Sequence, residues 1–254
     1  MQATPKQELK QQQQPEQIST TKPFFTFTHN PVEVELVDKL GTDLTVVNSA
    51  RISFGKQHSE VTPADKKLMN YLAREKHFSP FRHCMLQFRI RVPEFVARQA
   101  YKHVVGIEAT SVHPTKDHAW NEVSGRYKPY DTIYVPPTWH TQDANAKQCS
   151  GAEMTGEEAQ QTSELYHTAI SSCIKSYEEM LKNNVAKEQA RMLLPLTIMT
   201  EYVWTASLQA VFNFIQLRNA PHAQKEIQQL AREIERLTAE AFPQAYSALS
   251  QSSS

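Results

Sequence analysis

The chain has 254 residues, with 27 Lys and Arg balanced by 27 Asp and Glu, and 40% of its residues are hydrophobic. The balanced charge argues against a nucleic-acid-binding protein, which usually carries a basic surplus. The hydrophobic content excludes wholesale disorder. No apolar stretch is long enough to span a bilayer, no secretory signal is visible, and three cysteines without a CxxC pair form no disulfide framework. We expect a soluble, cytoplasmic protein without nucleic-acid or membrane partners.

The two ends differ in composition from the rest of the chain. Residues 1–22 are rich in Gln, Lys, Pro and Thr and offer little to bury, which predicts a disordered tail. Residues 249–254 are also expected to be disordered. No linker is visible between them, so residues 23–248 are predicted to form one domain.

Strand and helix patterns alternate in the first half of this domain. The periodicities predict strands over residues 32–38 and 84–92 and helices over residues 44–50, 63–76 and 94–101. In the second strand, Leu86, Phe88, Ile90 and Val92 share one face. From Gly156 onward the pattern is helical almost throughout, with helices predicted over residues 157–183, 187–193, 200–216 and 225–242. Early strands and late helices favour an α+β fold.

Glycine is scarce, and this scarcity limits how a nucleotide can be bound. The chain has six glycines, and no three of them form the GxGxxG of a dinucleotide-binding turn. Gly151 and Gly156 have the outer spacing of a phosphate-binding loop. However, Glu157 and Glu158 follow where Lys and Ser or Thr are required. Any bound nucleotide must therefore be held mainly by side chains.

Two nearby segments offer such side chains. On a helix, Arg98 and Lys102 share one face, as do Gln99 and His103. The Ser124-Gly125-Arg126 tripeptide combines a hydroxyl, an open backbone and a guanidinium, a set that suits a phosphate. Glu122, two residues before Ser124, suits a hydroxyl or a base N–H. The alternative is a solvated basic helix face followed by a turn.

Three further segments carry polar groups in apolar surroundings. Arg218 ends an apolar helix, where it is either a functional cation or a group that caps the helix dipole. Arg191 lies among apolar residues and is expected to meet an anion, because an unpaired buried arginine is unfavourable. The turn over residues 77–83, HFSPFRH, presents polar groups between aromatic rings.

These segments, in this order, resemble the flavin-dependent thymidylate synthases. The matching motifs are RISF (residues 51–54), HFSPFRH, FVARQ with KH, NEVSGRY, and LRNAPHAQ with EIQ, between about Val34 and Phe242. The resemblance implies synthesis of dTMP from dUMP, with 5,10-methylenetetrahydrofolate as carbon donor and NADPH-reduced FAD as hydride source. It also implies a small, mainly antiparallel sheet, a homotetramer with active sites at subunit interfaces, and no cysteine nucleophile or metal.

The resemblance also implies roles for particular residues. Arg218 is expected to be catalytic, contacting the pyrimidine and promoting its ionised form. The residues expected around dUMP are Gln99, Lys102, Glu122, Ser124, Gly125, Arg126, Arg191 and Arg218. Those expected around FAD are Ser53, His77, Ser79, Lys102, His103, Glu122, Ser207, Asn213 and His222.

The chain departs from the family pattern at several positions. The usual Arg-His-Arg is Lys102-His103-Val104, which loses a bidentate fork and one charge. Seventeen residues separate His103 from Asn121, more than in a typical member, and His113, Lys116 and His118 in this insert could supply phosphate contacts. Arg82 occupies a position that is often acidic, and Gln209 one that is often arginine.

Two other function classes are alternatives to this resemblance. A metal hydrolase would need ligands from the histidines and Asp117, yet no HExxH or other ligand spacing is present. A non-catalytic nucleotide-binding homologue, or a helical scaffold, would suit the helical second half and the altered Arg-His-Arg. Turnover of dUMP distinguishes the enzyme from such a protein.

Overall fold

The computed structural model describes residues 25–103, 118–144 and 150–252. The strands are β1 Thr26–Thr28, β2 Glu33–Leu40, β3 Met85–Pro93, β4 His118–Glu122, β5 Thr132–Tyr134, β6 His140–Gln142, β7 Ser150–Glu153 and β8 Met199–Ser207. The α-helices are α1 Asp43–Arg51, α2 Pro63–Arg74, α3 Glu94–Tyr101, α4 Gly156–Lys182, α5 Lys187–Ala190, α6 Leu208–Arg218, α7 Lys225–Ala241 and α8 Pro243–Gln251. Short 3-10 helices are η1 Ile52–Phe54, η2 Ser79–His83 and η3 Arg191–Leu193.

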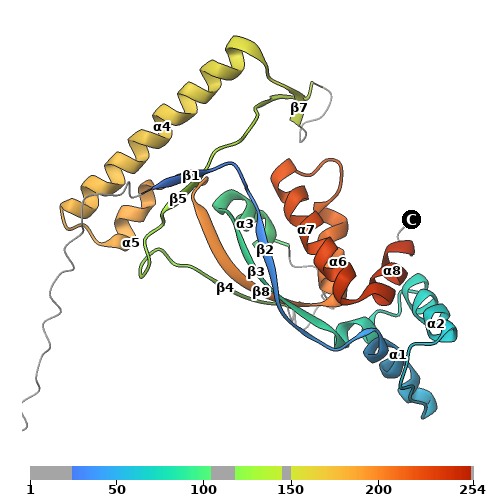
Figure 1. The fold of residues 1–254 in the computed structure, drawn as a ribbon. Coiled ribbons are helices and arrows are strands. Elements are labelled where there is room, and N and C mark those ends of the chain that lie inside the picture. The colour runs from blue at the N-terminus through green and yellow to red at the C-terminus, as the bar shows by residue number, and fades with distance from the viewer. Residues whose placement is uncertain (1–24, 104–117, 145–149, 253–254) are drawn as a thin grey trace, which may run out of the picture.

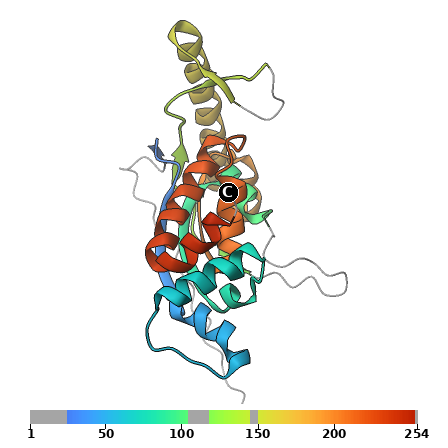
Figure 2. The same ribbon diagram turned by 90° about the vertical axis from the view of Figure 1, so that its right-hand side faces the viewer.

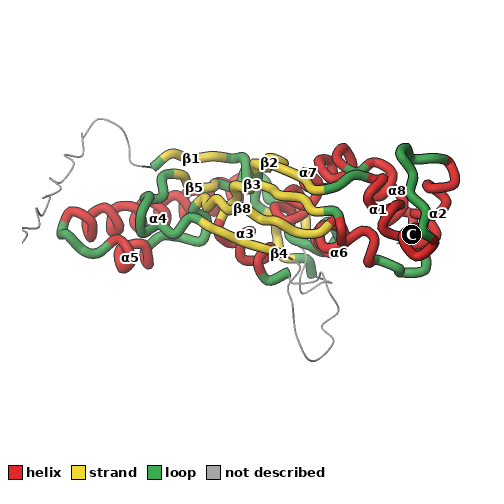
Figure 3. The backbone as a smooth tube through the Cα atoms, turned by 90° about the horizontal axis from the view of Figure 1, so that it is seen from below, coloured by secondary structure: helices red, strands yellow, loops and turns green. Residues whose placement is uncertain are grey.

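The molecule is elongated, with an antiparallel sheet near its middle. Figure 3 shows α4 and α5 at one end, and α1, α2 and α8 at the other. The sheet has the strand order β2-β3-β8-β4, while β1 pairs with β5 and β6 pairs with β7 in two small separate ladders. This α+β architecture with a small, mainly antiparallel sheet confirms the predicted fold class.

The two faces of the sheet have opposite character. On one face, Leu86, Phe88, Ile90 and Val92 of β3 are fully buried, as their alternation predicted. Helices α3, α6 and α7 pack against this sheet, and Figure 1 shows α6 and α7 together on one side of it. The other face is polar, and Arg89 bonds Glu201 across the strands at 2.7 Å. One packed face and one polar face are usual for an antiparallel sheet.

The predicted helix over residues 200–216 is wrong in its first half. Residues 199–207 form β8, the strand between β3 and β4, and α6 begins only at Leu208. Thr200, Tyr202, Trp204 and Ala206 are buried, alternating with more exposed residues, so the segment has the period of a strand. It is also rich in β-branched and aromatic residues, which favour strands.

The other predicted elements of the helical half are found within a few residues of their expected bounds. In α7, Ile227, Leu230 and Ile234 are fully buried along the predicted stripe. The C-terminal boundary differs from the prediction, because α8 continues to Gln251 and Leu249 is fully buried. Because α8 packs against α2, residues 249–252 belong to the fold. The predicted N-terminal tail, residues 1–22, lies outside the described residues.

Helices α7 and α8 follow one another at the C-terminus. Figure 2 shows them together with α2 along one side of the molecule.

Across the described residues, no helix has the length and apolar character that crossing a membrane requires.

A buried carboxylate joins α1 to α2. Asp65 is fully buried, and its Oδ1 accepts from Nε and Nη2 of Arg51 at 2.9 and 2.6 Å. Its Oδ2 lies 2.7 Å from Nδ1 of His58 and accepts from the Thr62 backbone and hydroxyl at 2.9 and 2.7 Å. Burial alone would raise the pKa of Asp65, but the bonds from Thr62, His58 and Arg51 outweigh it and hold that pKa well below its usual range.

We predict that Asp65→Asn lowers the free energy of unfolding by about 3 kcal/mol near neutral pH, because it leaves Arg51 without its counter-charge. The pKa of Asp65 is lowered on folding, so its contribution is present above the unfolded pKa and is lost as the pH falls. Denaturant unfolding at several pH values should therefore show the wild type and the variant converging below about pH 4.

Glu233→Gln is the matched control, because it also removes one carboxylate of an arginine pair, but an exposed one. Its effect should be much smaller than that of Asp65→Asn, because exposed ion pairs contribute little to stability. A loss of similar size in both variants would contradict the special role of Asp65.

Candidate active site

Gln99 joins α3 to the segment around the end of α6. Its side-chain amide donates to Oε1 of Gln224 at 2.7 Å. Its backbone carbonyl accepts from Nη2 of Arg218 at 3.1 Å. Gln99 and Arg218 are 119 positions apart in the chain. The structure therefore brings together two residues that the sequence assigned to one substrate site.

Arg218 has spare hydrogen-bonding capacity. It is the last residue of α6, and its side chain is partly buried. Burial lowers the pKa of its guanidinium. Among the described residues, its Nε is buried without a hydrogen-bond partner. Because a desolvated cationic donor is unfavourable until it is paired, this group is poised to bind an acceptor or an anion.

Glu122 is held at the end of β4 by its neighbours in the sheet. Its Oε1 accepts from the Thr200 hydroxyl at 2.7 Å, and its Oε2 accepts from Nε1 of Trp120 at 3.1 Å. The pairing of β4 with β8 places Glu122 opposite Tyr202. The carboxylate is therefore fixed in orientation although Glu122 itself is exposed.

The Ser124-Gly125-Arg126 segment is a tight bend in which the Ser124 hydroxyl accepts from the Arg126 backbone N–H at 3.3 Å. Gly125 has φ +63°, and a Cβ there would lie 2.5 Å from the Tyr130 ring, so only glycine fits. Nη1 of Arg191 donates to the Ser124 carbonyl. Arg126 is exposed. Within the part of the chain that the structure describes, Arg191 therefore meets a backbone oxygen rather than an anionic side chain, and it holds the predicted phosphate-binding turn.

Lys102 and His103 directly follow α3, and their side chains lie in different environments. His103 is buried, with its ring edge against Phe214 of α6 at a centroid distance of 5.2 Å. Lys102 is exposed and shares a pocket of about 300 Å³ with Glu122 and Glu94. Two predicted site residues thus line one pocket, together with a glutamate that the sequence analysis did not single out.

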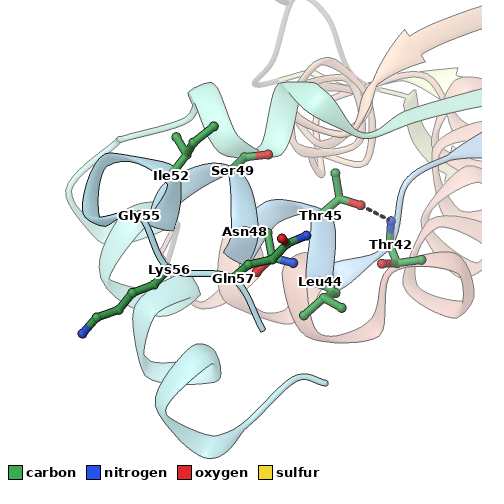
Figure 4. A pocket seen from close by; sticks show the side chains of 9 residues that line it. All are labelled: Thr42, Leu44, Thr45, Asn48, Ser49, Ile52, Gly55, Lys56 and Gln57. Carbon is green, nitrogen blue, oxygen red and sulfur yellow. Dashed lines mark hydrogen bonds between the residues drawn. The ribbon is translucent and has the colours of Figure 1, made fainter. Parts of the chain in front are cut away.

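Three of the residues predicted around FAD lie near the α1–α2 end. Ser53 is exposed in η1, directly after Arg51, which Asp65 anchors. Figure 4 shows a pocket beside it, of about 540 Å³, with Thr45, Asn48 and Gln57 among its lining groups. His77 and Ser79, at the start of η2, are exposed.

The other residues predicted around FAD are distributed along α6 and its ends. Ser207 is fully buried, and its hydroxyl accepts from the Ala210 N–H at 3.2 Å as the N-cap of α6. Asn213 is partly buried, and His222 is exposed in the connection to α7. The Ser207 hydroxyl thus supports the helix, whereas Asn213 and His222 remain accessible.

The predicted residues therefore fall into local groups. Gln99 contacts Arg218, Lys102 shares a pocket with Glu122, and Arg191 holds the turn at Ser124. The sequence analysis missed the supporting residues Glu94, Tyr130, Thr200 and Gln224. Thr200 was not predicted as a site residue because its segment was predicted to be helical, whereas it lies in strand β8. The alternation in residues 199–207 was the signal that could have placed it.

The described cysteines lack the setting of a nucleophile. Burial, followed by the charge of Asp43, raises the pKa of the Cys84 thiol to about 12, and its Sγ donates to the Thr42 carbonyl at 3.6 Å. A nucleophilic cysteine needs a lowered pKa. Cys173 is partly buried on α4, and Cys149 lies outside the described residues. Within the described ranges, no group of three or more acidic, histidine or cysteine side chains is arranged to bind a metal.

Comparison with known proteins identifies relatives of this chain. The family model described as thymidylate synthase complementing protein, Thy1, matches residues 35–244. A flavin-dependent thymidylate synthase of Thermus thermophilus is 37% identical over 216 residues, which cover 85% of this chain and 74% of that protein. One from Thermosipho melanesiensis is 35% identical over 211 residues, covering 83% and 86%.

A solved structure has a similar fold. The UMP/dUMP methylase PolB from Streptomyces cacaoi, bound with 5-Br dUMP, superposes with a TM-score of 0.75 at 26% identity. The match covers 89% of this chain and 96% of that one. The similarity in sequence and the similarity in fold therefore both extend over most of the chain.

We predict that Gly125→Ala disrupts the Ser124–Arg126 turn, because the methyl group adds a clash with Tyr130 to the strain of a positive φ. Gly156→Ala is the matched control. Its φ is +65°, but its Cβ would meet nothing within 4 Å. Calorimetric titration with dUMP should show at least about tenfold weaker binding for Gly125→Ala only, and equal binding by both variants would contradict a role for this turn.

Proposed function

Because the chain belongs to the thymidylate synthase complementing protein family, we propose that it is a flavin-dependent thymidylate synthase that converts dUMP to dTMP. The observation that carries this proposal is Arg218, a partly buried cation with an unpartnered Nε beside Gln99, among the described residues of a chain 37% identical to such an enzyme. The carbon donor is 5,10-methylenetetrahydrofolate and the hydride source is NADPH. The enzyme is a methyltransferase, and we place it in the cytoplasm.

Substrate binding is assigned to the groups that the sheet and α3 position. Ser124 and Arg126 bind the phosphate of dUMP through a hydroxyl and a guanidinium, supported by the Gly125 backbone and by Arg191. Glu122 accepts a hydrogen bond from a hydroxyl or the base N–H of the nucleotide. Lys102 supplies a positive charge next to Glu122.

Arg218 acts on the pyrimidine ring. A guanidinium that donates to a uracil carbonyl stabilises negative charge on the ring, and a more anionic ring is a stronger nucleophile at C5. Gln99 helps to hold Arg218, because its carbonyl accepts from Nη2. The buried, high-pKa thiol of Cys84 is unsuited to attack the ring in place of this route.

FAD is the cofactor of this family, and the residues present fit it. The donor groups of Ser53, His77, Ser79 and His222 are exposed at the surface, which suits a cofactor held without a Gly-rich loop. Lys102, His103, Glu122, Ser207 and Asn213 complete the proposed set; His103 and Ser207 are buried, and Ser207 acts by capping α6, the helix that carries Asn213. When bound, FAD carries the hydride that reduces the transferred carbon unit.

We also propose a homotetramer with active sites at subunit interfaces. In one chain, the residues assigned to dUMP and those near η1 form separate local groups. Large apolar side chains such as Ile52, Phe54 and Met192 are 74–77% exposed near these groups. Contacts between copies would cover such side chains and join the groups.

We predict that Arg218→Ala reduces dTMP formation by about 10²–10³-fold, because it removes stabilisation of the developing charge. Bound FAD, read from the visible absorbance spectrum, should be largely retained. Tritium release from the uracil C5 position, with folate and NADPH present, measures turnover. The control is Arg236→Ala, an exposed arginine of α7, which should retain activity.

Unchanged turnover in Arg218→Ala would remove this residue from the mechanism. A wild-type protein that binds dUMP but releases no tritium would favour the non-catalytic alternative. A protein that stays colourless after incubation with FAD would contradict the assigned cofactor. Bleaching of its flavin spectrum by NADPH under anaerobic conditions would support both cofactor and reductant.

A further inference from the structure

Two glutamates from different elements meet in the pocket beside α3. Glu94 is the first residue of α3 and Glu122 is the last residue of β4, and both line the pocket that contains Lys102. Burial, the charge of Glu122 and a hydrogen bond between the two side chains raise the pKa of Glu94, while Arg98 opposes this effect. Two interacting carboxylates that line one pocket favour sharing one proton.

The hydrogen bonds of Glu122 indicate how a proton on Glu94 would affect the Glu122 carboxylate. An ionised carboxylate offers about four acceptor positions. The Thr200 hydroxyl takes one at 2.7 Å, and Nε1 of Trp120 takes one at 3.1 Å. A protonated Glu94 takes a third. One acceptor position then remains for a ligand in the pocket.

We propose that Glu94 is a positioning residue that, while it carries a proton, donates to Glu122 and directs the remaining acceptor position of Glu122 toward a hydroxyl or base N–H of the nucleotide. Loss of the proton breaks that bond. It also places a second negative charge in the pocket, which repels an anionic nucleotide. The inference rests on the proposed function, because it assumes that dUMP occupies the site of Glu122.

Among the described residues, Glu94 is the group of this pocket whose charge is expected to change in the neutral range. The titratable groups that face the pair come from α3 and its C-cap, the segment before β5, η3 and β8, and within the described structure they are Arg98, Tyr101, Lys102, Tyr130, Arg191 and Tyr202. Arginine and lysine side chains ordinarily stay charged through the neutral range, and tyrosine side chains ordinarily stay neutral there. Burial, with the charges of nearby glutamates, raises the pKa values of Tyr130 and Tyr202 further.

The test compares dUMP binding by the FAD-loaded wild type and by Glu94→Gln, measured by calorimetry between about pH 5 and pH 9. The glutamine donates at the same place at every pH. The wild type should therefore lose affinity relative to Glu94→Gln as the pH rises through the raised pKa of Glu94, by about tenfold at the alkaline end. Titration of the phosphate of dUMP affects both proteins equally and cancels in the ratio.

Two further variants separate positioning from a structural role. Glu94→Ala removes the donor and should bind dUMP weakly at every pH, whereas the exposed Glu233→Gln should follow the wild type. An affinity ratio that stays constant with pH would overturn the inference, as would tight binding by Glu94→Ala. A wild type that binds no dUMP at any pH would instead overturn the proposed function.

Discussion

The pairing of β8 between β3 and β4 is the constraint on which the candidate site depends. Its register sets Glu122 opposite Tyr202, and Thr200 of the same strand bonds the Glu122 carboxylate. The chain continues from β8 directly into α6, with Ser207 as the helix cap. That continuation carries Arg218 back to the carbonyl of Gln99. A shift of one residue in β8 would reverse which side chains face the helices, and would separate these groups.

The sequence predicted the elements whose periodicity is unambiguous and failed where two patterns overlap. Strand β3 and helices α3 and α7 follow from a clear period of two or of 3.6 residues. Strand β8 was merged with the helix that follows, because both are apolar and no glycine or proline separates them. The predicted identities of the site residues rested on motifs. The contact of Gln99 with Arg218 joins positions 119 apart, which no local pattern reveals.

The scarcity of glycine explains how the site is built. Without a Gly-rich loop, backbone N–H groups have few places to approach a phosphate closely. Gly125 is the exception. Its positive φ and its close approach to the Tyr130 ring explain why a glycine is required at this position. Elsewhere, the proposed recognition depends on long side chains from the ends of strands and helices. Such side chains need support, and Arg191 and Thr200 supply it by bonding the turn and the glutamate.

Two kinds of charged group in this protein differ in how completely they are hydrogen bonded. The Asp65 carboxylate is surrounded by donors from Arg51, His58 and Thr62, so nothing is left for a ligand and its role is to join two helices. Arg218 keeps a buried, unpartnered Nε within the described structure, and the pair of Glu94 and Glu122 keeps an acceptor position. A folded chain gains nothing from leaving such capacity unused, because desolvation without a partner is destabilising. Incomplete hydrogen bonding at these places, beside the complete hydrogen bonding of Asp65, is therefore the physical reason for proposing Arg218 and the glutamate pair, and not Asp65, as groups that bind a ligand.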